Sequence, residues 1–203
     1  MTVVSTTGGA TPSGPHATPT TSALSPTATA VAATLPEGAI VSDEAATSGL
    51  FLAGATADAP RHSWLCLTGG SIGQGMPLAI GAAVACPDRR VLNVEADGSS
   101  LYTLQSLWTQ SREGLDVTTV ICNNRSYSVL NMELQRVGAD AVGPKALDML
   151  DLQRPDIDFV ALANGLGVPA VRVDTADDLT RELERSYAEP GPRLIEAMVP
   201  PII

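Results

Sequence analysis

An acidic residue and two amide residues follow apolar segments at positions where they could bind a metal ion. Asp97 comes directly after the strand-like segment 90–96, and Asn123 and Asn124 follow a second such segment, 116–122. Mg²⁺ prefers oxygen ligands in near-octahedral geometry, and a carboxylate, an amide and a backbone carbonyl provide half of such a shell. The sequence thus predicts a divalent cation at Asp97, completed by a phosphorylated ligand and water.

The residues after Asp97 suit a phosphate group. Gly98 lets a ligand approach the backbone closely, and the hydroxyls of Ser99 and Ser100 can donate hydrogen bonds beside the first amides of a predicted helix. A diphosphate could then be held without lysine, in a chain whose only lysine is Lys145. Asp-Gly-Ser and Asn-Asn are also common turn and cap sequences, so neither alone defines a metal site.

Strand-like and helix-like segments alternate along the chain. Strands are expected at residues 39–42, 63–67, 90–96, 116–122, 170–173 and 194–199. Helices are expected at residues 75–86, 101–113, 158–166 and 176–188, with 75–86 apolar nearly all round and therefore buried. This order predicts an α/β fold, a parallel sheet with helices on both faces. Ligands of such sheets bind outside the carboxyl ends of the strands, where segments 68–75, 96–100 and 122–128 should meet.

The first 34 residues differ from the rest. Residues 1–34 consist mainly of Thr, Ala, Ser, Pro and Gly and hold no charged side chain. We expect a disordered tail or linker there, since little bulky apolar surface is available to offset the ordering entropy. It is a poor signal or transit peptide, because the first basic residue is Arg61. One domain is expected over residues 35–203.

Composition excludes several classes of protein. The net charge of -10 and the lack of a basic patch argue against a nucleic-acid partner. The sequence contains no long apolar run that is free of Gly and Pro, so no membrane span is predicted. Cys66, Cys86 and Cys122 are widely spaced in apolar surroundings, which favours buried thiols in a cytoplasmic protein over disulfides or a zinc site.

The motifs together resemble a known family. Asp97-Gly98-Ser99, followed one helix and one strand later by Asn123-Asn124, resembles the thiamine diphosphate motif of G-D-G and N-N. The stretches GGSIGQGMPLAIGAA, DEAATSG, LYTLQSLWTQ and NNRSYSVLNMELQRVGA are similar to the acetolactate synthase and benzoylformate decarboxylase group. The resemblance covers residues 35–203 and implies their C-terminal, diphosphate-binding domain, whose fold is the thiamine diphosphate-binding fold.

The resemblance implies a role for ten residues. Mg²⁺ would be bound by the side chains of Asp97 and Asn124 and by the carbonyl of Ser126. The diphosphate would be faced by Gly98, Ser99, Tyr127, Thr47 and Ser48. Gly70 would offer its carbonyl to the aminopyrimidine, and Ile72 would hold the cofactor in its bent form, for which a side chain stiff at χ1 is suited. Two positions depart from the pattern: Ala96 replaces the first glycine of G-D-G, and Ala46 replaces a hydroxyl residue seen in some relatives.

No catalytic residue is expected in this chain. In the family, a glutamate on a separate pyrimidine-binding domain activates the cofactor, and by the match Glu37 and Glu44 belong to the diphosphate domain instead. His16 falls in the tail, and His62 precedes a strand, where a surface or loop position is expected. We therefore expect the chain either to pair with a pyrimidine-domain chain or to be a fragment of a longer enzyme that acts on a 2-keto acid. Association with a partner chain or as a homo-oligomer is also expected.

Three readings of the function stay open. One is a carboligase (transferase) of the acetolactate synthase type, and another is a simple decarboxylase (lyase) of the benzoylformate decarboxylase type. A non-catalytic cofactor-binding module is the third. A dinucleotide-binding protein is disfavoured, because Gly70, Gly73 and Gly75 have the wrong order for the G-x-G-x-x-G fingerprint.

Overall fold

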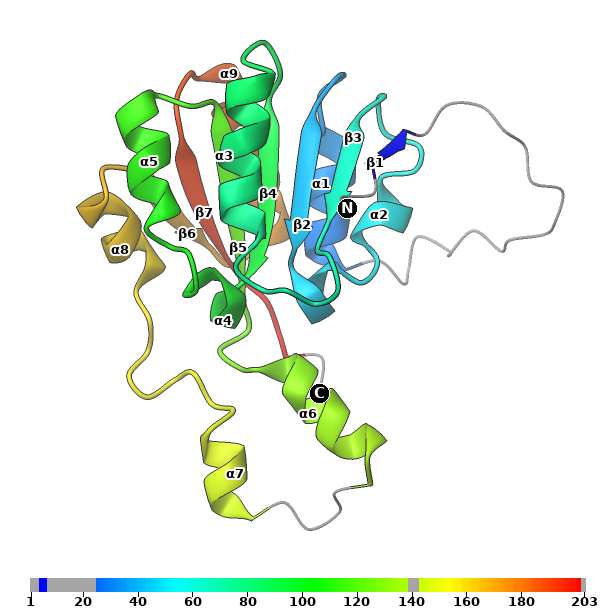
Figure 1. Cartoon of the computed structure of the whole chain (residues 1–203), viewed down its shortest axis with the longest axis vertical. Helices are drawn as coiled ribbons and strands as arrows, with labels where there is room; N and C mark the ends of the chain where they lie inside the picture. Colours follow the sequence, from blue (N-terminus) through cyan, green and yellow to red (C-terminus); the bar gives the residue numbers. More distant parts are fainter. Residues whose placement is uncertain (1–3, 7–24, 139–142, 202–203) are drawn as a thin grey trace, which may run out of the picture.

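A seven-stranded sheet forms the centre of the chain (Figure 1). The structure is a computed structural model and describes residues 4–6, 25–138 and 143–201. The strands are β1 (Val4–Thr6), β2 (Ile40–Glu44), β3 (Ser63–Cys66), β4 (Val91–Ala96), β5 (Val117–Asn123), β6 (Ala170–Val173) and β7 (Arg193–Met198). Their order is β1-β3-β2-β4-β5-β7-β6. Strands β2 to β7 run parallel, while β1 pairs antiparallel with β3 at one end of the sheet.

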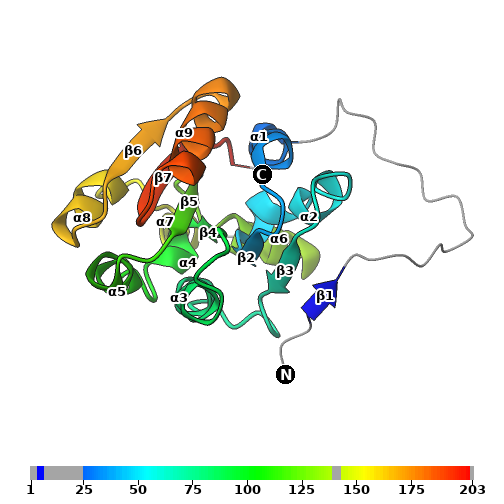
Figure 2. The same cartoon turned by 90° about the horizontal axis from the view of Figure 1, so that it is seen from above.

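Helices cover both faces of this sheet (Figure 2). The helices are α1 (Pro26–Thr34), the 3-10 helix η2 (Ala46–Gly49), α2 (Leu52–Ala55), α3 (Gly75–Ala85), α4 (Asp97–Ser100), α5 (Ser106–Glu113), α6 (Ser128–Arg136), α7 (Pro144–Asp148), α8 (Phe159–Gly165) and α9 (Ala176–Ala188). Side chains of α1, α2 and α9 pack on one face, and those of α3, α5 and α8 on the other. The predicted α/β fold is confirmed.

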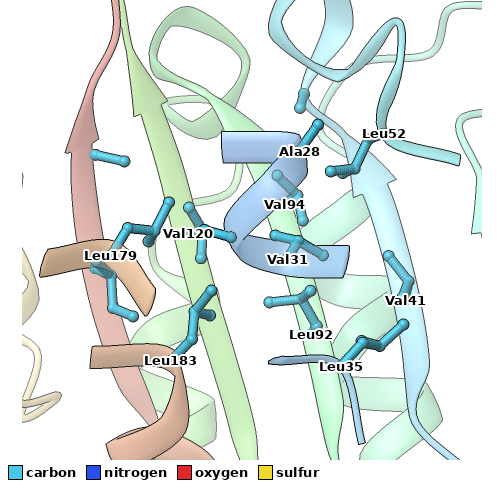
Figure 3. Packing of buried hydrophobic residues seen from close by; sticks show 14 of the residues in the cluster. Ala28, Val31, Leu35, Val41, Leu52, Leu92, Val94, Val120, Leu179 and Leu183 are labelled. Carbon is cyan, nitrogen blue, oxygen red and sulfur yellow. The ribbon is translucent and has the colours of Figure 1, made fainter. Parts of the chain in front are cut away.

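The prediction of a tail over residues 1–34 is wrong for its last part. Helix α1 begins after Ser25, whose hydroxyl accepts a hydrogen bond from the amide of Ala28 at 3.1 Å. Proline at the first helical position suits such a start. Ala28 and Val31 are fully buried beside the sheet and α9 (Figure 3). The same cluster includes Leu35, Val41, Leu92, Val94, Leu179 and Leu183.

The domain therefore includes residues 25–34 as well as the segment from residue 35. Short side chains let α1 lie close to the sheet, so burial there does not need bulky residues. Residues 1–3 and 7–24 lie outside the described residues, and residues 4–6 form β1. The expectation of a tail stays a prediction for residues 7–24.

Three further expectations need correction. The helix expected at residues 101–113 begins at Ser106, and residues 101–105 form turns after the short α4. The first strand does not end at residue 42 but continues through Glu44. Helix α3 is not buried all round, since Met76, Ala79 and Ala83 face the core while other positions are exposed. Its apolar outer face leaves Val84 62% exposed.

The carboxyl ends of β2 to β7 lie together, and we call this side of the sheet the carboxyl edge. In Figure 1 it is the lower side, where α4 follows β4 and where α6 and α7 extend away from the sheet. Every motif that the sequence singled out follows one of these strands. None of the helices in the described part of the chain is long and apolar enough to cross a membrane.

Candidate functional site

The two main motifs meet at the carboxyl edge. Strands β4 and β5 are paired in parallel, with Ala96 opposite Cys122. Asp97 directly follows Ala96 as the first residue of α4, and Asn123 follows Cys122 as the last residue of β5, so the two motifs lie side by side where these strands end. The expectation that segments 96–100 and 122–128 lie together is confirmed.

The carboxylate of Asp97 is held by the backbone that follows β5. Its Oδ2 accepts a hydrogen bond from the amide of Arg125 at 2.6 Å, and its Oδ1 accepts one from the amide of Gly98 at 2.8 Å. The side chain is buried, with 2% exposure. Burial raises the pKa of the Asp97 carboxyl above its ordinary value, while amides of Gly98, Arg125, Asn124 and Ser126 act in the opposite direction.

The loop around Arg125 has an unusual backbone that directs these amides. Arg125 has a φ of 58°, in the left-handed region that few residues other than glycine adopt. Segment 150–152 supports the loop from outside, since the amide of Leu152 donates to the carbonyl of Arg125 at 3.0 Å and that of Tyr127 to the carbonyl of Leu150 at 2.9 Å. This support could not be predicted from the sequence, because it comes from a segment without regular helix or strand structure.

The two asparagines have different surroundings. Asn123 donates from Nδ2 to Glu196 at 2.7 Å, and its Oδ1 accepts from the amide of Arg125 at 3.0 Å. Asn124 instead accepts from the amide of Ser126 at 2.9 Å and donates to Ser128 at 3.2 Å. Asn123 is thus tied into the sheet, and Asn124 belongs to the loop. Of the two amides that the sequence left open as ligands, Asn124 is the one that is not committed to the sheet.

The donor set beside Asp97 fits a hard divalent cation. Across residues 4–6, 25–138 and 143–201, no three His, Cys, Asp or Glu side chains come together as a metal site. A cation here would therefore take most of its ligands from amide and carbonyl oxygens, from a phosphate and from water, as Mg²⁺ does. The side-chain oxygen of Asn124 and the carbonyl oxygen of Ser126 each accept one backbone hydrogen bond, and each keeps a second lone pair. A cation would also offset the cost of burying the Asp97 carboxylate.

Gly98 and Tyr127 lie in contact beside this position. A Cβ on Gly98 would overlap the aromatic ring of Tyr127, so the space left by the missing side chain is filled by that ring. The hydroxyl of Ser99 donates to the carbonyl of Ala96 at 3.2 Å. The hydroxyl of Ser100 donates to the carbonyl of Asp97 at 2.7 Å and is therefore not directed toward a ligand at the carboxyl edge. What Ser99 offers to a ligand at the edge is thus its backbone.

The glycine-rich segment 68–75 forms a loop at the same edge. Gly69, Gly70 and Gly73 have φ values of 62°, 72° and 91°, which only glycine adopts readily. The side chain of Ile72 is 39% exposed at the tip of this loop. The loop joins β3 to α3, so segment 68–75 lies at the carboxyl edge, as expected.

Two buried glutamates at the strand ends were not expected. Glu44 and Glu95 are register partners on β2 and β4, and each is 1% exposed. Burial, and next the charge of Glu44, raise the pKa of Glu95 well above its ordinary value. The amides of Gly73 and Gly75 both donate to the carboxylate of Glu44. In the sequence, both glutamates come at the end of an apolar strand-like segment, and this is the signal that could have identified them as buried.

Thr47 and Ser48 lie on η2, directly after β2. They line a cavity of about 450 Å³ together with the first residues of α1 and α9 and the end of β7. This cavity is mostly apolar and does not include Asp97, Gly98 or Asn124. Thr47 and Ser48 thus lie at the carboxyl edge as expected, but the cavity that they border does not extend to Asp97.

The other residues considered from the sequence lie away from this edge. His62 precedes β3 at the amino end of the strand, with its Nδ1 2.7 Å from the carbonyl of Pro60. Glu37 accepts a hydrogen bond from the amide of Arg61 at 3.1 Å. His16 lies outside the described residues. The position of His62 outside the strands agrees with the loop position expected for it.

Comparison with known proteins identifies relatives over most of the chain. Residues 46–197 match the family described as thiamine pyrophosphate enzyme, C-terminal TPP binding domain. A Mycobacterium tuberculosis protein that carries the name acetolactate synthase large subunit IlvX is 58% identical over 85% of this chain and 34% of its own length. Acetolactate synthase isozyme 1 large subunit of Escherichia coli is 29% identical over 83% of this chain and 29% of its own length.

Solved structures also match this chain over most of its length. The thiamine diphosphate-dependent 4-hydroxybenzoylformate decarboxylase of Rhodococcus jostii superposes with a TM-score of 0.74 at 30% identity, over 86% of this chain and 32% of that one. Benzoylformate decarboxylase from Polynucleobacter necessarius has a TM-score of 0.69 at 22% identity, which is evidence for the fold alone. The chain thus spans about one third of the length of these relatives.

Proposed function

Because the chain belongs to the family of thiamine pyrophosphate enzymes, as their C-terminal TPP-binding domain, we propose that it binds thiamine diphosphate with Mg²⁺ for the reaction of a 2-keto acid. The observation that carries the proposal is the meeting of the buried Asp97 carboxylate with the 124–126 loop at the ends of β4 and β5. When bound, the cofactor supplies the carbon nucleophile and the electron-accepting ring for decarboxylation.

The residues of this chain bind and orient the cofactor. Mg²⁺ would be held by Asp97, Asn124 and the carbonyl of Ser126, all of which border one loop. The diphosphate would lie against the backbone of Gly98 and Ser99 and against Tyr127, whose ring must move aside to admit it. Thr47 and Ser48 would approach from η2. Gly70 and Ile72 would contact the rings from the glycine-rich loop.

Isothermal titration of thiamine diphosphate tests this proposal. Binding that requires Mg²⁺ supports it, and binding of NAD or ATP in place of thiamine diphosphate contradicts it. Ile72→Ala is expected to weaken diphosphate binding less than it weakens any reconstituted activity. Equal loss of both would contradict the proposed contact of Ile72 with the rings.

The reaction type we favour is that of acetolactate synthase, a carboligase that also decarboxylates. The named relative at 58% identity supports it. A benzoylformate decarboxylase-like lyase is the second candidate, supported by the solved decarboxylase at 30% identity. A cofactor-binding module without activity is the third. Products formed from pyruvate and from benzoylformate distinguish the first two, and binding without turnover under any pairing indicates the third.

We also propose that activity needs a pyrimidine-binding domain from another chain. Apolar side chains are exposed around the carboxyl edge, which is typical of a surface that meets a partner. They are Leu50, Phe51, Ile72, Leu101, Tyr102, Val129 and Leu130. Homo-oligomers are expected as well, because the outer face of α3 is apolar and exposed. The expectation of buried thiols holds for Cys122 but is wrong for Cys66, which is exposed, and for Cys86, which is half-buried. All three thiols are free, which supports a cytoplasmic location.

Decarboxylation assays test the need for a partner. The purified chain alone is expected to show no turnover of pyruvate or benzoylformate, and turnover is expected after addition of the remaining part of the Mycobacterium tuberculosis relative. Robust turnover by the chain alone would refute the need for a partner.

A further inference from the structure

Glu44 holds the glycine-rich loop by both of its carboxylate oxygens. Oε1 accepts the amide of Gly73 and Oε2 accepts the amide of Gly75. Glu44 is the last residue of β2, paired in register with Glu95, and is 1% exposed. The hydroxyl of Ser42, two residues earlier on the same strand, donates to the carbonyl of Gly75 at 3.0 Å. Strand β2 thus fixes the point where the loop enters α3.

The loop has few contacts of its own that could replace this one. Its internal backbone hydrogen bonds are Ser71 to Thr68, at 3.1 Å, and Ile72 to Gly70, at 3.0 Å. Both close short turns. The side chain of Gln74 joins the two ends of the loop, since its Oε1 accepts from the amide of Thr68 at 3.2 Å and its Nε2 donates to the carbonyl of Cys66 at 3.5 Å, but neither bond reaches Gly70 or Ile72. The left-handed backbone of Gly69, Gly70 and Gly73 is compatible with many loop shapes, since glycine restricts the chain least. Contacts from outside the loop must therefore select one shape.

Glycine is required at both amides that Glu44 accepts. A Cβ on Gly73 would lie 2.9 Å from Cβ of Tyr102, and a Cβ on Gly75 would lie 2.9 Å from Cβ of Glu44 and overlap Glu95. A side chain would therefore not fit at residue 73 or at residue 75, where the backbone lies close to the Glu44 carboxylate. Only a carboxylate can accept two N–H groups with its two oxygens, because a glutamine would place an NH₂ group against one of them.

We propose that Glu44 is a positioning residue that fixes Gly70 and Ile72 against the rings of the bound cofactor, an inference that rests on the proposed function. Glu44 contacts the loop at Gly73 and Gly75, and it affects Gly70 and Ile72 only through these two residues. Its action on the ligand is therefore indirect, and it concerns the ring end. The diphosphate end would be held by Asp97 and the 124–126 loop, to which Glu44 makes no hydrogen bond within the described residues. The Ser99 hydroxyl lies 3.4 Å from the backbone carbonyl of Glu44, a contact that does not involve the Glu44 side chain.

The test compares two ligands that share the diphosphate. Titration of Glu44→Gln with thiamine diphosphate and with inorganic pyrophosphate, both with Mg²⁺, separates the ring end from the diphosphate end. Loss of one charged hydrogen bond is expected to weaken thiamine diphosphate binding about tenfold and pyrophosphate binding less than about twofold. Equal weakening of both ligands, or of neither, would overturn the proposal.

The matched control is Glu95→Gln, the same substitution on the neighbouring strand. Within the described residues, Glu95 accepts no loop amide, and its Oε1 has no hydrogen-bond partner. The ratio of the two affinities is expected to stay within about twofold of the wild type, since no bond to the loop is lost. A ratio that changes as much as in Glu44→Gln would overturn the assignment to Glu44.

Amide hydrogen exchange tests the contact without any ligand. In the wild type, the amides of Gly73 and Gly75 are expected to exchange more slowly than those of Gly69 and Gly70, and Glu44→Gln should speed the exchange of the one amide that then faces its NH₂ group. Rapid exchange of Gly73 and Gly75 in the wild type would overturn the proposal even if the variant fails to fold. If the wild type binds no thiamine diphosphate, the proposed function fails, while exchange still tests the clamp on the loop.

Discussion

Oδ2 of Asp97, after β4, lies 2.6 Å from the backbone nitrogen of Arg125, after β5. This hydrogen bond joins two motifs that are separated in the sequence by a helix and a strand. It also brings the carboxylate to the loop that holds Asn124 and Ser126. The proposed metal site consists of this carboxylate and the neutral oxygens of that loop, and the substitutions below test the parts of this arrangement.

Gly98→Ala should destabilise the fold through a clash with the ring of Tyr127. Overpacking of this kind costs about 1–3 kcal/mol, and Tyr127→Ala in the same chain should recover part of it. Urea unfolding measures both effects. The control is Gly81→Ala on α3, where a Cβ meets nothing within 4 Å and a gain of about 0.5–1 kcal/mol is expected from helix propensity. No recovery in the double variant would contradict the contact.

Glu196→Gln should loosen the connection between Asn123 and the sheet. Glu196 is fully buried, accepts from Asn123 and binds Arg172 through both oxygens, at 2.9 and 3.0 Å. Loss of this charge should lower the free energy of unfolding by about 1.5–3 kcal/mol, the range for hydrogen bonds to charged groups. Chemical denaturation measures it.

The control for Glu196 is a salt bridge on the surface. Glu113→Gln removes a partner of Arg112 in a pair whose side chains are 59% and 44% exposed. A change below about 0.5 kcal/mol is expected there, because exposed pairs contribute little. Similar losses in the two variants would show that burial does not decide the strength of the Glu196 network.

Val31→Ala tests the inclusion of α1 in the domain. Val31 is fully buried against the sheet, so its truncation should cost about 1–3 kcal/mol through lost burial and a residual cavity (Figure 3). Val137, at the end of α6, is 67% exposed, and Val137→Ala should change stability by less than about 0.5 kcal/mol. Thermal unfolding of the two variants measures the difference, and equal stability would mean that α1 does not pack as described.

Asp43→Asn should change how stability depends on pH. Burial raises the pKa of Asp43 above its ordinary value of 3.8, and the charge of Glu44 adds to this. Between 3.8 and the raised pKa, the folded state binds more protons than the unfolded state, so this group contributes less stability as pH rises. The asparagine variant lacks that loss. Its stability relative to the wild type should increase from pH 3.5 upward and level off by neutral pH, as urea midpoints can show, and a decrease would contradict the sign.

Much of the fold could be predicted from patterning. Residues 170–173 and 176–188 were expected as a strand and a helix, and β6 and α9 have those bounds. Thr175 caps α9, while Leu179 and Leu183 mark its buried face. These segments combine a clear cap with regular apolar spacing, so local sequence and tertiary packing agree.

Other parts of the fold depend on contacts between residues that are distant in the sequence, and local apolar patterning does not show these contacts. Helix α1 is made of small residues, and composition alone suggested a tail, although Ser25 and Pro26 are a helix-start signal. The extension of β2 to Glu44 was missed because a buried acid at a strand end is stabilised by loop amides from residues 73 and 75. The left-handed backbone of Arg125 depends on Asp97 and Leu152, which are distant in sequence.

The most direct measurement is a titration of thiamine diphosphate into the wild type and Asp97→Ala, each with and without Mg²⁺. The account predicts that the wild type binds the cofactor only with Mg²⁺ and that Asp97→Ala does not bind it in either condition. If Asp97→Ala keeps the affinity and the Mg²⁺ dependence of the wild type, the proposed cofactor site at the ends of β4 and β5 is contradicted.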